Sequence, residues 1–168
     1  MDLDTSFVVE ALRWIVHSLR VTAHRAESDV GLSGAQLFVL RELANEPGIT
    51  IRRLSQRTLT DASSVSVVIA KLVESGLVTR TRDAGDARKS VLAPSAQGKA
   101  LLRKSPEPYQ QRLIGAVQDL PPARRRQLRL ALSAIVSATA DASGVAPLFF
   151  EEEKAAKRKS KRGAHATA

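Results

Sequence analysis

Residues 61–94 read DASSVSVVIAKLVESGLVTRTRDAGDARKSVLAP, and this stretch decides the fold. Asp61 can cap a helix, because its carboxylate can accept a backbone N–H of the first turn and favours the positive end of the helix dipole. Apolar residues then recur at helical spacing, at Val65, Ile69 and Leu72. Gly76 stands where this helix should end, since glycine adopts the left-handed conformation without a Cβ penalty. The first half of the stretch therefore predicts an amphipathic helix.

The second half predicts a short β-hairpin. Leu77–Arg82 and Lys89–Ala93 carry alternating and β-branched residues, and the segment between them, DAGDAR, is typical of a turn. The outward positions of the preceding helix are mostly small: Ser63, Ser66, Val67, Ala70 and Glu74. A helix that can approach DNA closely, followed by a basic hairpin, is the arrangement of a winged helix-turn-helix.

Two shorter helices precede this stretch, and both begin at clear capping signals. Ser33 and Gln36 form a capping box, flanked by a hydrophobic staple of Leu32 and Leu37. That helix has a leucine face and should end at Asn45–Gly48. The next helix begins after a threonine cap and leads through a tight turn into the helix at residue 61, which completes a helix-turn-helix. We expect Thr50 as its cap, Ile51 and Leu54 inward, Arg52, Arg53 and Arg57 outward, and Leu59-Thr60 as the turn.

A long helical pattern covers residues 5–29. Its apolar stripe is too wide for one neighbouring helix to cover: Val8, Leu12, Ile15, Leu19, Thr22 and Ala26, broadened by Phe7, Ala11 and Trp14. The opposite side carries Glu10, Arg13, His17, Arg20, His24 and Glu27. This side can be a solvated charged face or a cationic lining for an anionic ligand. Zinc binding through the two histidines is disfavoured, because an arginine lies between them and cations repel one another.

Helical patterns resume after the hairpin. Ser95 can cap a helix through Gly98, Leu101 and Leu102, and Pro106 and Pro108 should interrupt it because each lacks a backbone donor. A helix over Tyr109–Leu120 follows. Pro121-Pro122 suits the first turn of a final helix. The apolar face of that helix consists of Leu128, Leu132, Ile135 and Val136, and Gly144 and Pro147 should end it.

Composition limits the class of protein. The 168 residues suit one domain of ordinary size, and a net charge of +9 favours a polyanionic partner such as nucleic acid. The absence of cysteine excludes disulfides and thiol catalysis and agrees with a cytoplasmic protein. We find no membrane-spanning stretch and no signal-peptide pattern at the N-terminus. From Glu151 onward the sequence EEEKAAKRKSKRGAHATA has no apolar periodicity, which predicts a basic tail.

Three segments together resemble the MarR family of transcription regulators. They are the run LVESGLVTR at Leu72–Arg80, the triplet Asp86-Ala-Arg88 in the hairpin turn, and Ser95-Ala-Gln-Gly98 after it. The resemblance covers about residues 5–140. It implies a mainly α fold with a small β wing, in which a winged helix-turn-helix is joined to terminal dimerisation helices.

The resemblance also implies a domain organisation and a mode of action. Residues 1–30 would be an N-terminal dimerisation helix, 31–96 the DNA-binding core, 97–147 the C-terminal dimerisation helices and 148–168 a flexible basic tail. The homodimer would bind a palindromic site in double-stranded DNA and act as a repressor that a small-molecule effector releases. Paired recognition helices place the two half-sites about one helical turn apart.

By position, the resemblance assigns a set of residues to DNA: Ser63, Ser64, Ser66, Val67, Lys71, Arg80, Arg82, Arg88 and Lys89. Arg88 would enter the minor groove, and Asp86 would shape the wing. Val67 departs from the family, which often places arginine or lysine there. Valine cannot bond to guanine in a bidentate manner and can only contact a thymine methyl or leave space. The effector, for which our hypothesis is a small organic anion, would bind at Arg13, Trp14, His17 and Arg20.

The sequence leads to two other hypotheses of function. A less specific, architectural DNA-binding protein would use the same fold and gain affinity from its basic tail. An enzyme is disfavoured, because the three histidines lie on one helix and in the tail, away from any recognisable pair of carboxylates. The sequence predicts no cofactor and no metal site.

Overall fold

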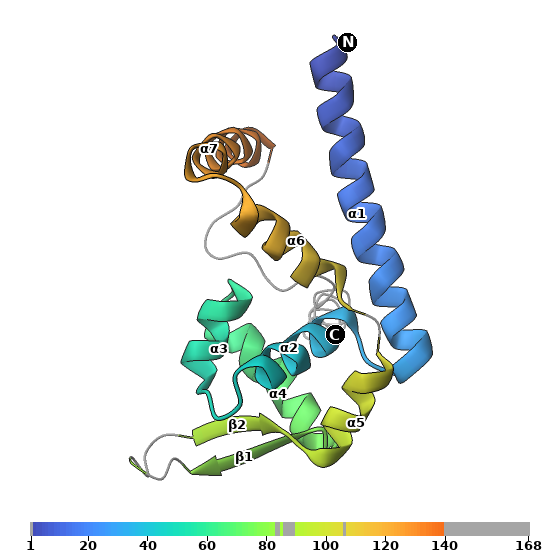
Figure 1. The fold of residues 1–168 in the computed structure, drawn as a ribbon, viewed down its shortest axis with the longest axis vertical. Coiled ribbons are helices and arrows are strands. Elements are labelled where there is room, and N and C mark those ends of the chain that lie inside the picture. Colours follow the sequence, from blue (N-terminus) through green and yellow to red (C-terminus); the bar gives the residue numbers. More distant parts are fainter. Residues whose placement is uncertain (1, 83–84, 86–89, 106, 140–168) are drawn as a thin grey trace, which may run out of the picture.

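The computed structural model describes residues 2–82, 85, 90–105 and 107–139. Within these residues the chain forms seven α-helices and one antiparallel pair of strands (Figure 1). The mainly α fold with a small β wing is therefore as the sequence predicted. The elements are α1 (Leu3–Val30), α2 (Gly34–Asn45), α3 (Ile51–Thr58), α4 (Ala62–Glu74), β1 (Val78–Arg82), β2 (Ser90–Pro94), α5 (Ala96–Lys104), α6 (Tyr109–Asp119) and α7 (Pro122–Thr139).

The helix boundaries follow from local hydrogen bonds at the predicted caps. In α2 both halves of the capping box are present, with the Gln36 N–H donating to Ser33 Oγ at 3.2 Å and the Ser33 N–H donating to Gln36 Oε1 at 2.9 Å. Helix α4 ends in a Schellman motif around Gly76, whose φ is +71°. There the N–H of Leu77 donates to the carbonyl of Leu72 at 2.9 Å. Thr50, Asp61 and Ser95 cap α3, α4 and α5 as expected.

One buried core joins α2, α3, α4 and the base of the sheet. Helix α2 lies in the centre and contacts α1, α3, α4, α5 and β2. The largest fully enclosed side chains are Phe38, Leu37, Leu40, Leu43, Leu54, Ile69, Leu72 and Leu92. Each such side chain contributes about 1.5–3 kcal/mol relative to an exposed one. We call the segment from α2 to α5, including β1 and β2, the winged core.

The wing is anchored to the helices at its base. Strands β1 and β2 pair from Val78 opposite Pro94 to Arg82 opposite Ser90. The segment before α3 joins them, because the Leu92 N–H donates to the Ile49 carbonyl at 2.9 Å and the Gly48 N–H donates to the Leu92 carbonyl at 2.8 Å. The wing is thus connected by backbone hydrogen bonds to the segment that leads into α3.

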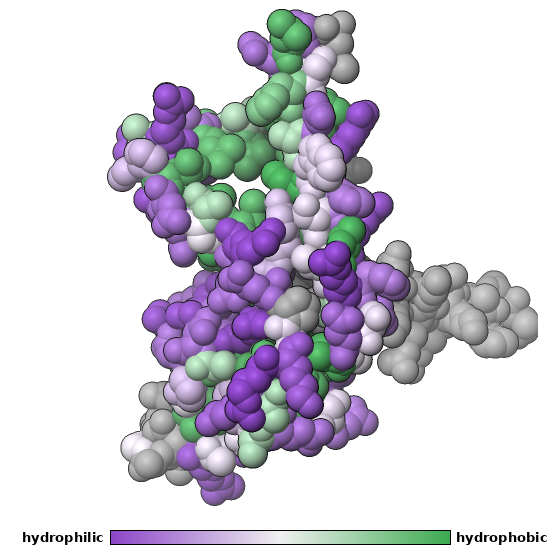
Figure 2. Space-filling view, turned by 45° about the vertical axis from the view of Figure 1, so that its right-hand side comes forward, coloured by the Kyte–Doolittle hydropathy of each residue, from purple (hydrophilic) through white to green (hydrophobic). Residues whose placement is uncertain are grey.

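The terminal helices bury little. Leu19 and Ala26 are the buried residues of α1, and among the described residues of α6 and α7 none is buried. Figure 2 shows apolar surface gathered in the upper half of the molecule, where the N-terminal part of α1 and helix α7 lie. The exposed apolar residues there include Leu3, Phe7, Val8, Trp14, Val16, Leu128, Leu130, Leu132, Ile135 and Val136. No helix in the described part of the chain is long and apolar enough to cross a membrane.

Several boundaries differ from the sequence expectation for physical reasons. Helix α1 begins at Leu3, ahead of the predicted residue 5, because Asp2 caps it and accepts the Thr5 N–H at 2.8 Å. The first strand begins one residue later than predicted, since Leu77 belongs to the end of α4 and its carbonyl accepts the Ser95 N–H. The predicted stop at Gly144 and Pro147 and the tail lie outside the described residues.

Candidate nucleic-acid interface

Helix α4 presents a uniform exposed face, with its buried face directly opposite. Val65, Val68, Ile69 and Leu72 point into the core. The exposed face follows from spacings of three and four residues. Its members are Ser63, Val67, Ala70, Lys71 and Glu74. This face is exposed in the described part of the chain, at the position where the second helix of a helix-turn-helix meets the major groove.

The serines of α4 differ in how their hydroxyls are used. Ser64 donates its hydroxyl hydrogen to Asp61 Oδ2 at 2.8 Å, and Ser66 donates to the carbonyl of Ala62 at 2.6 Å. Their oxygens keep lone pairs that can accept hydrogen bonds. Contact of Ser64 and Ser66 with DNA stays a prediction, but their hydroxyl hydrogens bond within the helix. Ser63 is exposed and is the serine of α4 whose hydroxyl makes no recorded bond among the described residues.

Asp61 neutralises the N-terminus of α4. Its carboxylate accepts the Ser64 N–H at 2.9 Å. This backbone bond, followed by the Ser64 hydroxyl, lowers the pKa of Asp61 below its ordinary value of 3.8. The carboxylate is therefore ionised at neutral pH. Because this negative charge lies at the N-terminus of α4 and already accepts one of its backbone N–H groups, it disfavours a phosphate there, and any attraction to a polyanion must come from cationic side chains.

Strand β1 supplies such cations next to α4. Arg80 and Arg82 alternate with threonines, so both lie on the sheet face that carries the buried Val78. Both are exposed, as is Lys71 on α4. Within the described part of the chain, none of the three forms an ion pair with a carboxylate. The fold thus places Arg80 and Arg82 on the strand that follows α4 and contacts it, whereas the predicted Asp86, Arg88 and Lys89 lie outside the described residues.

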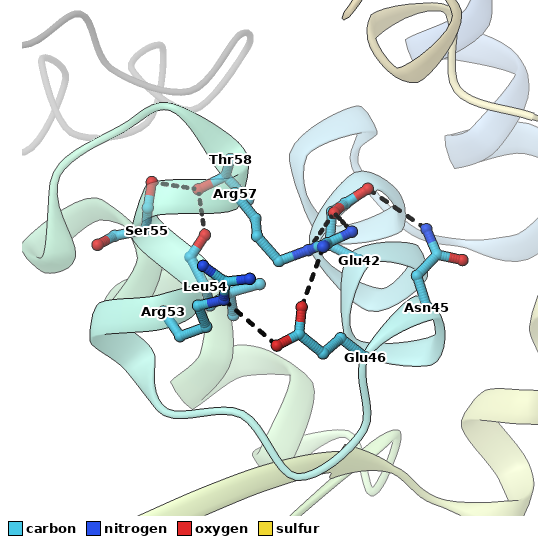
Figure 3. A network of polar contacts seen from close by, with 8 residues as sticks. All are labelled: Glu42, Asn45, Glu46, Arg53, Leu54, Ser55, Arg57 and Thr58. Atoms are coloured by element: carbon cyan, nitrogen blue, oxygen red, sulfur yellow. Dashed lines mark hydrogen bonds and ion pairs between the residues drawn. The ribbon is translucent and has the colours of Figure 1, made fainter. Parts of the chain in front are cut away.

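A network of ion pairs holds α3 against α2 (Figure 3). Arg57 Nη2 lies 2.7 Å from Glu42 Oε2, and Arg57 Nη1 lies 3.0 Å from Glu46 Oε2. Arg53 Nε also contacts Glu46, at 3.3 Å. The Glu42 side chain is only 8% exposed, and Arg57 is 30% exposed. The prediction that Arg57 points outward was therefore wrong, because its long side chain turns back to a buried carboxylate.

Sequence reasoning missed this positioning role, although a signal for it was present. Glu42 lies among the leucines of the buried face of α2, where a carboxylate needs a cationic partner. Arg52, which precedes Arg57 on α3, is exposed and makes no ion pair with a described residue. Among the described residues, Arg53 and Arg57 thus form ion pairs and Arg52 does not.

Ser95 and Gly98, which belong to the segment that resembles the MarR family, have structural roles at the junction between α5 and the wing. Ser95 Oγ donates to the Gly76 carbonyl at 2.7 Å and accepts the Gly98 N–H at 3.0 Å. A Cβ on Gly98 would lie 2.2 Å from the carbonyl oxygen of Leu77. Glycine is needed here for close approach of two backbones. This packing sets the position of the wing base relative to α4.

The residues predicted to meet an effector lie on α1. Arg13, His17 and Arg20 line a hollow of about 410 Å³ together with Val9, Leu12 and Val16. Trp14 is absent from this lining among the described residues, but its ring contacts His17 edge to face at 5.7 Å. Two cations, one imidazole and an apolar floor are suited to an anion with an apolar body.

Comparison with known proteins identifies the winged core. Residues 30–89 match the model of the MarR family. The HTH-type transcriptional regulator SarZ of Staphylococcus aureus (strain COL) is 30% identical over 87 residues, which are 52% of this chain and 56% of SarZ. The match thus spans little more than half the length of this curated relative.

Solved structures share the fold over a larger part of the chain. A crystal structure of the S. aureus MepR–DNA complex superposes with a TM-score of 0.54 at 19% identity, over 77% of this chain and 96% of MepR. The transcriptional regulator BldR from Sulfolobus solfataricus gives a TM-score of 0.54 at 20% identity, over 82% of this chain and 99% of BldR. Residues 30–89 of this chain thus match the MarR family of transcription regulators, and the chain shares the winged helix-turn-helix fold of these solved structures.

Proposed function

We propose that this protein is a homodimeric transcription regulator that binds a palindromic operator through α4 and the wing. In this proposal it acts as a repressor and leaves the operator when a small organic anion binds. The observation that carries the proposal is the exposed face of α4, followed by the exposed Arg80 and Arg82 on β1, in a segment that matches the MarR family. The MepR–DNA complex supports it, because a protein of the same fold was crystallised on DNA.

Electrostatics support DNA as the partner. The charges of Lys71, Arg80 and Arg82 are not compensated by carboxylates within the described residues. Each phosphate contact releases counterions and adds about 0.9 to the slope of log affinity against log salt. Arg88 and Lys89 would extend the same surface by their place in the sequence. Two copies related by a two-fold axis would double it.

Dimerisation is supported by the unpaired apolar faces of α1 and α7. Leu128, Leu132, Ile135 and Val136 share one side of α7, and each is at least 36% exposed. The N-terminal half of α1 is exposed in the same way. Soluble proteins rarely leave apolar surface of this extent uncovered. An isologous contact with a second copy covers both faces at once.

Control by an anion rests on the hollow along α1. Arg13 and Arg20 can bind a carboxylate, and Val9, Leu12 and Val16 can contact an apolar body. Helix α1 packs against α2 and α6, so a ligand here would contact the helix that joins the apolar faces to the winged core.

A salt titration tests this proposal against the architectural alternative. Duplexes enriched from a random library and unselected duplexes are titrated with the full chain and with a chain truncated after Phe150. A specific regulator prefers the enriched duplex by about 10³-fold or more, and truncation weakens both complexes equally. The truncation removes six Lys/Arg and three Glu, a net +3 of the formal +9. Equal affinity for both duplexes would support the architectural protein.

A further inference from the structure

We propose that Val67 recognises the methyl group of a thymine in the major groove, so that the preferred DNA carries thymine at one position of each half-site. This inference rests on the proposed function and specifies what the N-terminal half of α4 reads. In this inference an apolar contact determines the DNA sequence preference. A charged or amide side chain at the same position would read a base through hydrogen bonds instead.

Val67 lies at the middle of the exposed face of α4. Its side chain is 51% exposed and stands opposite the buried Val65 and Leu72. Ser63 precedes it by one turn and Ala70 follows it by one turn on the same face, and both are small. The valine is therefore the largest apolar group on this face, and its small neighbours allow it to approach the floor of the groove.

The hydrogen-bonding groups around Val67 do not compete for the same base. Ser64 and Ser66 use their hydroxyl hydrogens within the protein. The charged members of the face, Lys71 and Glu74, lie at least one turn closer to the C-terminus of α4. A recognition helix reads base edges chiefly with its N-terminal residues. Ser63 and Val67 are thus the residues of this face placed to read bases.

Only one base presents an apolar group in the major groove of ordinary DNA. Thymine carries a C5-methyl there next to its O4 acceptor, whereas guanine, cytosine and adenine present hydrogen-bonding atoms and no methyl group. A valine over any of these atoms would desolvate them without a replacement bond. The physical chemistry therefore favours thymine at Val67 and penalises the other bases.

The stability of α4 does not explain why residue 67 is a valine. Because its side chain is half exposed, it adds little to the core, and β-branched residues lose rotamer freedom in a helix. Val67→Ala should therefore fold normally. Val73 provides a matched control, since it is 38% exposed on the same helix but lies away from the face of Val67.

The experiment compares thymine with deoxyuridine, which lacks only the methyl group. Duplexes are first enriched with the full chain from an unmethylated random library, so that thymine is the only source of a C5-methyl. Each thymine of the enriched site is then replaced by deoxyuridine in both half-sites. Affinities of the wild type, Val67→Ala and Val73→Ala are measured by fluorescence anisotropy, and circular dichroism confirms that the variants fold.

One thymine position per half-site should be sensitive to the loss of its methyl group. Deoxyuridine there should weaken binding of the wild type about fourfold when one half-site is changed and roughly 15-fold when both are changed, as expected for one buried methyl group in each half-site. Val67→Ala should bind both duplexes equally, and Val73→Ala should discriminate like the wild type. If the wild type binds every deoxyuridine duplex as tightly as the thymine duplex, the inference is overturned but the proposed function is not. Discrimination that persists in Val67→Ala would also overturn it, because another residue or the shape of the DNA would then be responsible. Failure to enrich any duplex would instead refute the proposed function.

Discussion

The winged core and the terminal helices bury apolar side chains to very different extents. From Leu32 to Leu92 the core encloses a continuous set of leucines, valines and isoleucines, with Phe38 at its centre. The terminal helices α1, α6 and α7 are as rich in such residues, yet the only ones they bury are Leu19 and Ala26, among the residues described. A single copy thus completes the core but leaves the terminal helices without sufficient partners.

This difference indicates which part of the molecule can be stable by itself. The core has caps at each of its helices, a Schellman motif after α4 and backbone hydrogen bonds that connect the wing. The terminal helices find little burial within the described part of one copy, and helices in water gain most of their stability from such packing. Substitutions in the two regions should therefore change different quantities: the free energy of unfolding in the core, and the association constant in the terminal helices.

The sharpest contrast is between two helical glycines. A Cβ at Gly98 would lie 2.2 Å from the Leu77 carbonyl oxygen, whereas a Cβ at Gly115 in α6 would have no neighbour within 4 Å. Gly98→Ala should lower the free energy of unfolding by about 3 kcal/mol or more, since backbone atoms must move. Gly115→Ala should raise it by about 0.5–1 kcal/mol. Urea unfolding of both variants measures these changes, and a mild effect at Gly98 would show that the wing base is loosely packed.

A second contrast separates the two sides of α7. Replacing Leu132 and Ile135 together by glutamate should weaken dimerisation on the order of 100-fold, because each side chain is lost twice in a symmetric interface. Leu130→Glu is the matched control, since Leu130 is 55% exposed on the opposite side of the helix. Analytical ultracentrifugation measures association. A double variant that stays as dimeric as the wild type would place the interface elsewhere.

A third prediction concerns the arginines of α3. Arg57→Ala should lower the free energy of unfolding by about 2–3 kcal/mol, because it leaves the nearly buried Glu42 without its cation. Arg52→Ala should change stability by less than about 0.5 kcal/mol, since Arg52 has no such partner in the described structure.

A second substitution tests the cause of this loss. Adding Glu42→Gln to Arg57→Ala should recover part of the stability, because a neutral amide costs less to bury than an unpaired carboxylate. Thermal unfolding followed by circular dichroism provides the comparison. Equal effects of the Arg57 and Arg52 variants would mean that the network shown in Figure 3 contributes little.

The smallest effect is expected at the cap of α4. Because the folded pKa of Asp61 is lowered below 3.8, the ionised carboxylate adds stability that is complete above pH 3.8 and is lost as the pH falls through the folded pKa. Asp61→Asn retains a capping side chain but does not titrate, so this part of the acid dependence should disappear. Unfolding curves between pH 2 and 6 test the difference, and identical acid profiles would exclude a contribution from the cap.

Local signals in the sequence predicted most of the core. The Ser33/Gln36 capping box, Asp61 and Gly76 act within a few residues of their own position, so their roles follow from short-range spacing. The exposed Val67 could be placed for the same reason, since helical periodicity fixes the face on which a residue lies.

Features that depend on distant residues were not predicted. Arg57 meets Glu42 across 15 residues of sequence, and periodicity does not tell where the end of a long side chain turns. The close approach at Gly98 depends on how α5 crosses the end of α4, which no local pattern encodes. Leu59 was assigned to a turn, but its left-handed conformation, with φ +56°, could not be foreseen because glycine or asparagine usually occupies such a position.

The hydrogen bonds at the base of the wing have a consequence for amide exchange. The N–H groups of Leu92, Gly48 and Ser95 all donate to carbonyls held by the core. They should exchange with solvent only when the whole core unfolds, as slowly as the amides in the middle of α4. We therefore expect the base of the wing and α4 to open as one cooperative unit. A ligand that reorients one of them must move the other with it or pay the free energy of global unfolding.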